Sequence, residues 1–166
     1  LRRQRQMCIR DRLSTDTVQT RLFTEADVQR AKNSSPDDCS FPFRMGSRGY
    51  EYWESDLHNI ISLGLDICRL SISWSRLFPT GFEDQPNPEN VAYYDRIIRA
   101  LANAKIKVFV TINHYAIPIA IIDRYGGWRH RDVIGLYLMM AKFVVNRWRG
   151  DVDYWLPINE INSGYL

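Results

Sequence analysis

Helix-like and strand-like segments alternate along the chain from Tyr50 onward, and this alternation limits the folds that the chain can adopt. Each amphipathic helical pattern is followed by a short strand-like run, and successive strands are joined by connections of helical length. Strands joined in this way pair in parallel through right-handed crossovers. The sequence therefore predicts an α/β fold with a parallel sheet.

Three helices and three strands are expected from this pattern. The first helix stops at Gly64, which can adopt the left-handed conformation that often follows a helix. The strands are apolar or alternate with a period of two residues. In chain order, the predicted elements cover residues 53–63, 67–74, 88–104, 108–112, 131–148 and 154–159.

The first strand-like run separates polar and apolar residues onto two faces. The two faces are Arg69, Ser71 and Ser73, and Cys68, Leu70, Ile72 and Trp74. In a closed α/β barrel the outward face of a strand packs on helices, whereas the inward face can be polar near the carboxyl ends of the strands. A sheet buried on both faces would instead carry apolar residues on each. We therefore expect a partial (β/α)8 TIM barrel, truncated after about the fourth strand.

The two ends of the chain define the expected domain boundaries. Residues 1–12 include Met7 to Arg12, which resembles the translation of a transposase adapter used in sequencing libraries, so we expect a foreign scar. A natural basic arm is the alternative. Residues 13–40 are rich in polar residues and predict a weakly ordered lead-in. Residues 41–166 are assigned to the amino-terminal half of the barrel.

The net charge depends on that first segment. The chain has 22 Lys and Arg against 19 Asp and Glu, a net charge of +3. Without the five Arg and one Asp of residues 1–12, the balance is 17 against 18. Since no run of like charges occurs elsewhere, nucleic acid is not expected as a partner.

Cellular location is expected to be cytoplasmic. No apolar run approaches the ~20 residues of a membrane span, and no signal-peptide pattern opens the chain, so no membrane partner is expected. Cys8, Cys39 and Cys68 lack the spacing of a metal site. Cys68 lies in a strand-like run and is predicted to be a buried free thiol.

Polar residues follow the second and third predicted strands. The second strand ends in Asn113, His114 and Tyr115, and the third ends in Asn159 and Glu160. Active sites of α/β barrels lie at this carboxyl end of the strands. Strand parity places His114 on the outward face, so a bend or bulge is needed to turn it inward.

Four sequence blocks in chain order resemble a known family. They are residues 69–79, 111–118, 125–128 and 154–162. Together they resemble glycoside hydrolase family 1, the family of β-glucosidases and 6-phospho-β-glycosidases, over about residues 50–162. The resemblance implies a barrel enzyme that hydrolyses a small-molecule β-glycoside with retention of configuration, without a metal or organic cofactor.

The resemblance also implies roles for individual residues. Glu160 matches the general acid/base, and Asn159 matches the residue that binds the sugar 2-hydroxyl. His114 matches a ligand of sugar hydroxyls, and Arg69 matches the arginine beside the nucleophile. These roles suit the chemistry, because the leaving oxygen needs a proton from a carboxylic acid that is protonated near neutral pH. A nearby arginine keeps the second carboxylate ionised.

Two parts of the family's site have no match in this chain. The nucleophile is a Glu on a late strand, which would lie beyond Leu166. A Gln of the first strand is also without a match. Because retaining hydrolysis needs two carboxyl groups about 5 Å apart, we expect this chain alone to be inactive.

The residues around the acid/base resemble those of phospho-specific members. Ile161 and Asn162 follow Glu160, and Ile often stands there in 6-phospho-β-glycosidases where simple β-glucosidases have Pro. Tyr115 stands where many β-glucosidases have Trp. The substrate expected is therefore a β-glucoside, with the 6-phosphorylated form favoured. Glucoside against galactoside, the aglycone and the oligomeric state stay open.

Other interpretations compete with this one. A non-catalytic, glycosidase-like carbohydrate-binding or structural protein would share the blocks but lack the nucleophile. An unrelated (β/α)8 enzyme, such as an aldolase or isomerase, would show phosphate-binding glycines or a Schiff-base lysine at a strand end. At the level of single residues, Glu160 could be a solvated loop acid and Arg69 could form a structural ion pair.

Overall fold

The computed structural model describes residue 33 and residues 48–161. The chain divides into two compact units, residues 1–51 and 52–166, and the elements below belong to the second. The expected adapter segment, the lead-in apart from Asn33, and Asn162 lie outside the described residues.

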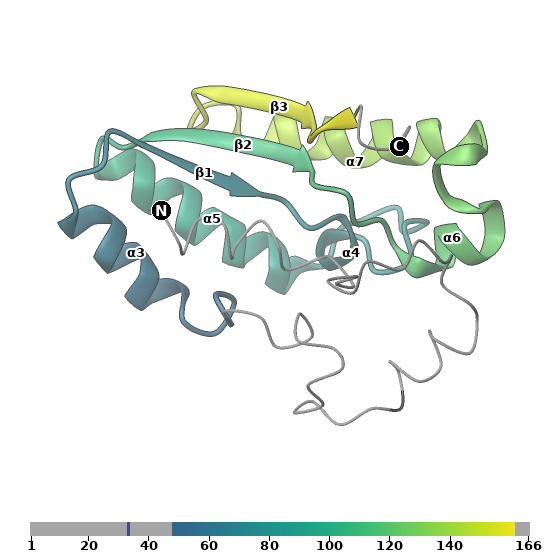
Figure 1. Ribbon diagram of the computed structural model, residues 1–166, viewed down its shortest axis with the longest axis horizontal. Helices are drawn as coiled ribbons and strands as arrows, with labels where there is room; N and C mark the ends of the chain where they lie inside the picture. The colour runs from purple at the N-terminus through teal and green to yellow at the C-terminus, as the bar shows by residue number, and fades with distance from the viewer. Residues whose placement is uncertain (1–32, 34–47, 162–166) are drawn as a thin grey trace, which may run out of the picture. The chain divides into compact units, whose positions relative to one another are not determined.

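The strands of the described part form one parallel sheet in the order β1-β2-β3, with all arrows pointing the same way in Figure 1. They are β1 (Ile67–Ser71), β2 (Lys107–Asn113) and β3 (Tyr154–Ile158). Cys68 lies opposite Val108, and Val110 lies opposite Trp155. The predicted α/β organisation with a parallel sheet is confirmed.

Three long helices lie where the sequence predicts them. They are α3 (Trp53–Ser62), α5 (Pro88–Asn103) and α7 (Asp132–Trp148). The hydrophobic periodicity does not predict the shorter helical segments, which are α4 (Trp74–Leu77), α6 (Ile119–Tyr125) and the 3₁₀ turn η1 (Gly127–Arg129). Among the described residues, no helix has the length and apolar character needed to cross a membrane.

The helix ends follow signals in the sequence. Asn87 precedes α5 and accepts a hydrogen bond from the backbone N–H of Asn90 at 3.0 Å, and Pro88 occupies the first helical position. Gly64 follows α3 with φ of +62°, as its predicted role as a stop requires.

The first predicted strand is wrong at its carboxyl end, because β1 stops at Ser71 and Trp74 begins α4. The backbone N–H of Ile72 still donates to the carbonyl of Thr111 at 2.9 Å. The next N–H, that of Ser73, donates to the hydroxyl of Tyr94 on α5 at 2.8 Å. The chain therefore leaves the sheet there, although Trp74 is buried as the apolar pattern predicts.

The core lies between one face of the sheet and the helices α5 and α7. It contains Cys68, Leu70, Ile72, Val108 and Val110 from the β1 and β2 segments, and Tyr94, Ile98, Leu101, Tyr137, Met140, Val144 and Trp148 from the helices. The prediction for Cys68 is confirmed: it is a buried free thiol, and burial raises its pKa to about 11.

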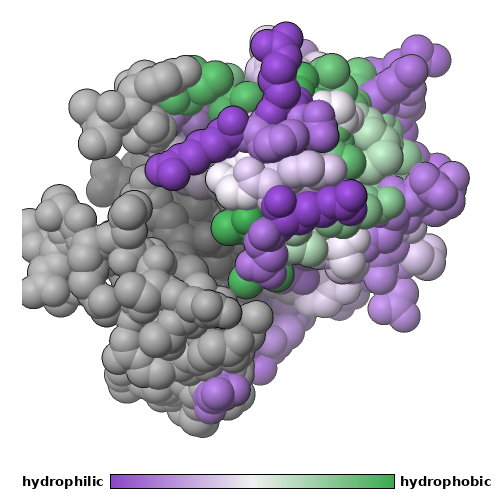
Figure 2. All heavy atoms as spheres, turned by 90° about the vertical axis from the view of Figure 1, so that its right-hand side faces the viewer, coloured by the Kyte–Doolittle hydropathy of each residue, from purple (hydrophilic) through white to green (hydrophobic). Residues whose placement is uncertain are grey.

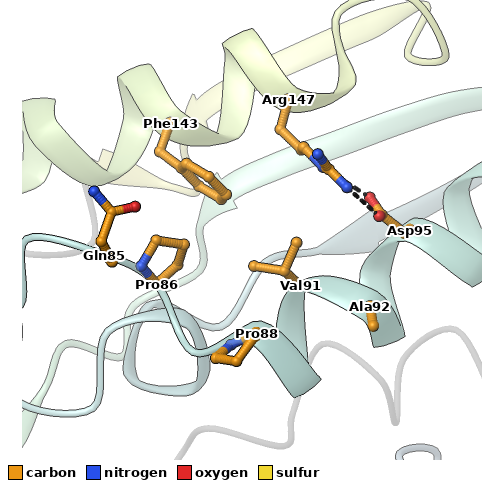
Figure 3. A pocket seen from close by; sticks show the side chains of 8 residues that line it. All are labelled: Gln85, Pro86, Pro88, Val91, Ala92, Asp95, Phe143 and Arg147. Atoms are coloured by element: carbon orange, nitrogen blue, oxygen red, sulfur yellow. Dashed lines mark hydrogen bonds and ion pairs between the residues drawn. The ribbon is translucent and has the colours of Figure 1, made fainter.

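Helices α5 and α7 are joined by a cluster around Asp95 (Figure 3). Its carboxylate accepts hydrogen bonds from Nε of Arg147 at 3.1 Å, from Nη2 of Arg147, and from the indole N–H of Trp148 at 2.8 Å. Burial raises the pKa of Asp95, but these hydrogen bonds and the charge of Arg147 outweigh burial, so its pKa lies below the usual value. Beside the cluster runs a shallow groove lined by Gln85, Pro86, Pro88, Val91, Ala92 and Phe143.

Candidate active site

The face of the sheet opposite the core carries the predicted polar residues. Arg69 of β1 lies opposite Phe109 of β2, and Ser71 lies opposite Thr111. These four positions alternate with the buried core positions along each strand, so they share one face, which we call the open face. The carboxyl ends of the strands point toward the side of the molecule that holds α6 and η1. Figure 2 views that side, where hydrophilic residues are mixed with smaller hydrophobic patches.

Arg69 connects all three strands across the open face. Its Nε donates to the hydroxyl of Thr111 at 2.9 Å, and its Nη2 donates to Oδ1 of Asn159 at 2.6 Å. The guanidinium carbon lies 5.4 Å from the centre of the Phe109 ring. No ion pair of Arg69 occurs among the described residues. Its side chain is held by two neutral hydrogen-bond partners and one aromatic ring.

His114 lies on the same side as Ser71. Its Nδ1 is 3.0 Å from the hydroxyl oxygen of Ser71, and the residue is 8% exposed. The outward position that strand parity gives to His114 is therefore wrong. β2 ends at Asn113, and the N–H of Ala116 donates to the carbonyl of His114 at 3.0 Å, with Tyr115 between them at φ of +69°. This tight three-residue turn ends the alternation of the strand.

Tyr115 and Glu160 meet across the ends of β2 and β3. The hydroxyl of Tyr115 donates to Oε2 of Glu160. Both residues have positive φ, +69° and +41°, which is uncommon for residues other than glycine. Glu160 is exposed, whereas Asn159 beside it is 5% exposed. The backbone N–H of Asn159 donates to the carbonyl of Asn113 at 2.9 Å, so the end of β3 is fixed to the end of β2.

Four of the five predicted site residues thus lie at the carboxyl ends of β2 and β3, and Arg69 reaches them from the middle of β1. They supply one carboxylic acid, one amide, one imidazole, one guanidinium and one phenol. Such a set donates and accepts many hydrogen bonds, and it suits a ligand with several hydroxyl groups. In the part of the chain that the structure describes, His, Cys, Asp and Glu form no group of three or more that could hold a metal ion.

Comparison with known proteins gives the family. The sequence model of glycosyl hydrolase family 1 matches residues 23–165, which include every residue of this site. The chain belongs to glycosyl hydrolase family 1. The resemblance carried by the four sequence blocks is therefore confirmed.

Several family 1 proteins are similar to this chain. It is 37% identical over 144 residues to the aryl-phospho-beta-D-glucosidase BglH of Bacillus subtilis, covering 84% of this chain and 31% of that protein. It is 35% identical over 151 residues to the phospho-cellobiase of Klebsiella oxytoca, covering 90% of this chain and 31% of that protein. The chain thus spans about a third of the length of the curated relatives that it matches.

A solved family 1 structure is similar in fold. The β-glucosidase from Thermotoga maritima, in complex with castanospermine, superposes with a TM-score of 0.63 and 32% sequence identity. The match covers 68% of this chain and 25% of that chain. The parallel sheet and its helices therefore have the arrangement of the matching part of a family 1 β-glucosidase.

Two residues of this candidate site are not singled out by sequence reasoning. Ser71 is predicted as part of the polar face of β1 and Thr111 as part of a strand. Both lie in the blocks that resemble the family, but neither is given a role there. Both hydroxyls contact a predicted site residue, Ser71 at His114 and Thr111 at Arg69. Ser71 is two residues from Arg69 on β1, and the register pairs it with Thr111 on β2. Alternation along the strands therefore places both hydroxyls on the same face as Arg69.

Proposed function

We propose that this chain is the amino-terminal part of a retaining glycoside hydrolase that acts on β-glucosides. One observation carries the proposal: hydrogen bonds link Arg69 to Asn159, and Tyr115 to Glu160, across three consecutive strands at their carboxyl ends. In α/β barrels this is the end at which substrates bind.

Each residue has a role in the proposed reaction. Glu160 donates a proton to the leaving oxygen and then accepts one from the attacking water. Asn159 binds the sugar 2-hydroxyl, a contact that strengthens as positive charge develops on the ring. His114 and Tyr115 contact the substrate beside it. Arg69 lies next to a nucleophilic carboxylate that another part of the complete enzyme supplies, and no metal or organic cofactor takes part.

We further propose that the substrate is a 6-phospho-β-glucoside and that the enzyme acts in the cytoplasm. Two relatives support the phosphorylated form, because one is named an aryl-phospho-β-D-glucosidase and the other a phospho-cellobiase. Ile161 and Tyr115 agree with that choice. A phosphate site built from cations and donor hydroxyls leaves those groups unpaired when a neutral sugar binds, so it discriminates strongly.

The substrate proposal is tested by comparing two disaccharides on the complete enzyme. We expect kcat/KM for cellobiose 6′-phosphate to exceed that for cellobiose by a factor on the order of 10³. Equal values, or a preference for cellobiose, would identify a β-glucosidase for unphosphorylated sugars instead.

The role of Glu160 is tested with Glu160→Ala in the complete enzyme. We expect a large loss on substrates with poor leaving groups and a much smaller loss on activated aryl glycosides, because only the former need a proton in the first step. Azide should restore turnover of the aryl glycoside by attacking the glycosyl-enzyme. Glu89→Ala, an exposed glutamate in the first turn of α5, serves as the control. Equal losses on both substrate types without azide rescue would show that Glu160 is structural, and sugar binding without turnover by the unsubstituted protein would favour a carbohydrate-binding protein.

A further inference from the structure

We propose that Thr111 is a positioning residue of this site. Its hydroxyl holds Arg69, and Arg69 holds the amide of Asn159 with the NH₂ group presented to the sugar. The inference rests on the proposed function and extends it to a residue that does not itself touch the substrate.

Thr111 lies at the centre of the sheet. It belongs to β2, the middle strand, with Ser71 of β1 on one side and Leu156 of β3 on the other. It is fully buried, with 0% exposure, and its backbone carbonyl accepts the N–H of Ile72. The backbone is therefore fixed by the sheet, and the hydroxyl is the part of Thr111 that acts on its neighbours.

The Thr111 hydroxyl sets the direction of the Arg69 side chain. Nε carries a single hydrogen, which points to Oγ1 of Thr111 at 2.9 Å. A guanidinium group is planar, so fixing Nε and placing the plane near the Phe109 ring also fixes where Nη2 points. Among the described residues these neutral contacts orient Arg69, and they leave its other guanidinium nitrogen, Nη1, for the carboxylate proposed above.

Arg69 in turn decides which end of the Asn159 amide is available. Nη2 of Arg69 can only donate, so the atom that faces it at 2.6 Å is the carbonyl oxygen. The backbone of Asn159 is held by Asn113, so rotation of the side-chain amide is the freedom that remains. Its NH₂ group is then the end that points away from Arg69, and this group can only donate. The site thus meets the sugar 2-oxygen with a hydrogen-bond donor.

The test uses paired substrates in the complete enzyme. Thr111→Val removes the hydroxyl and keeps the shape of the side chain, and Thr111→Ser keeps the hydroxyl. For a β-glucoside with its 2-hydroxyl, we expect kcat/KM to fall on the order of tenfold in the Val variant. The Ser variant should stay close to the unsubstituted enzyme. For the matching 2-deoxy glycoside, the Val variant should lose little, because the contact that Thr111 supports is already missing.

A second measurement separates positioning from general damage to the fold. In an Asn159→Ala background, Thr111→Val should cost nothing further, because both changes remove the same contact. Thr80→Val, which removes an exposed hydroxyl from the loop before α5, is the matched control and should leave both substrates unaffected. Should Thr111→Val not fold, Thr111→Cys replaces it, since a thiol is a weak acceptor of similar size.

The outcomes distinguish this inference from the function on which it rests. Equal losses on the 2-hydroxy and 2-deoxy substrates, or a full further loss in the Asn159→Ala background, would overturn the role of Thr111 while leaving a glycoside hydrolase. Absence of any hydrolysis by the unsubstituted complete enzyme would overturn the proposed function, and the role of Thr111 with it.

Discussion

At the scale of single residues, the hydroxyl of Ser71 orients the ring of His114. A neutral imidazole has one donor nitrogen and one acceptor nitrogen, and the hydrogen bond at one nitrogen determines the role of the other. A serine hydroxyl can both donate and accept, so its contact with Nδ1 at 3.0 Å restrains the ring plane of His114 in either tautomer. A ligand hydroxyl then meets an imidazole of defined orientation.

This contact makes a prediction for Ser71. Ser71→Ala in the complete enzyme should raise KM by a factor on the order of five to ten, with a smaller change in kcat, because a neutral hydrogen bond contributes about 1 kcal/mol. Ser71→Thr, which keeps the hydroxyl, should restore KM. Steady-state kinetics of both variants measure KM and kcat. Ser75 is an exposed serine at the start of α4, and Ser75→Ala is the control. An unchanged KM in Ser71→Ala would exclude the contact as a determinant of binding.

The alternation of side chains along a strand predicts the correct face of the sheet for some residues of the site and the wrong face for others. It groups Arg69 with Ser71 correctly, because β1 is regular over those positions. It fails for His114, because the alternation stops one residue earlier at Asn113. The strand gives way to a turn at this point, with Tyr115 in the left-handed conformation, and a tyrosine carries no sequence signal for that conformation, unlike glycine or asparagine.

At the scale of elements, the strands and the long helices could be predicted, whereas the short helices could not. Helices α5 and α7 contain several turns, so their apolar positions repeat often enough to show a helical period. Helix α4 has only four residues and α6 has seven, which is too short for a period to appear. The early end of β1 has a different origin, because the chain turns into α4 at Trp74, where the N–H of Ser73 donates to Tyr94 on α5.

The Asp95 cluster between α5 and α7 makes a prediction about pH. The pKa of Asp95 in the folded protein is below its ordinary value of 3.8. Its contribution to folding is therefore full above about pH 4 and is lost as the pH falls through the folded-state pKa. Asp95→Asn should lower the free energy of unfolding by about 1 kcal/mol at pH 7, since Arg147 is partly exposed and the interaction is screened.

Chemical denaturation of the complete enzyme at pH 7 and pH 3 measures this effect. The difference between Asp95→Asn and the unsubstituted protein should shrink at pH 3. Asp123→Asn, an exposed aspartate on α6, should change neither value. A difference of the same size at both pH values would mean that the ionised carboxylate is not what joins the two helices.

At the scale of the whole molecule, the edges of the sheet are the main feature. Within residues 48–161, the outer edges of β1 and β3 pair with no further strand. Apolar side chains lie exposed along these edges, among them Ile67 at 43% and Tyr154 at 47%. Unpaired edges with apolar side chains favour association with other chains. The three strands of this sheet follow from the local periodicity of the sequence, whereas their pairing register and the exposure of single edge residues do not.

The isolated 166-residue chain is therefore expected to self-associate and to be inactive. Light scattering of the purified chain should show particles larger than a monomer, because unpaired strand edges associate with other chains. Assays with aryl β-glucosides and their 6-phosphates should show no turnover above that of Glu160→Gln, because the proposed nucleophile is supplied from elsewhere. An active, monomeric chain would contradict both expectations.

The left-handed conformations of Tyr115 and Glu160 have an evolutionary consequence. A residue with a side chain is less stable in this region than glycine is, by an amount on the order of 1 kcal/mol each. Glycine at either position would remove the backbone strain and raise the stability of the folded protein, yet it would delete the phenol or the carboxylic acid. Selection for stability and selection for activity therefore act in opposite directions at these two positions, and a lineage released from the need for catalysis would be expected to drift there first.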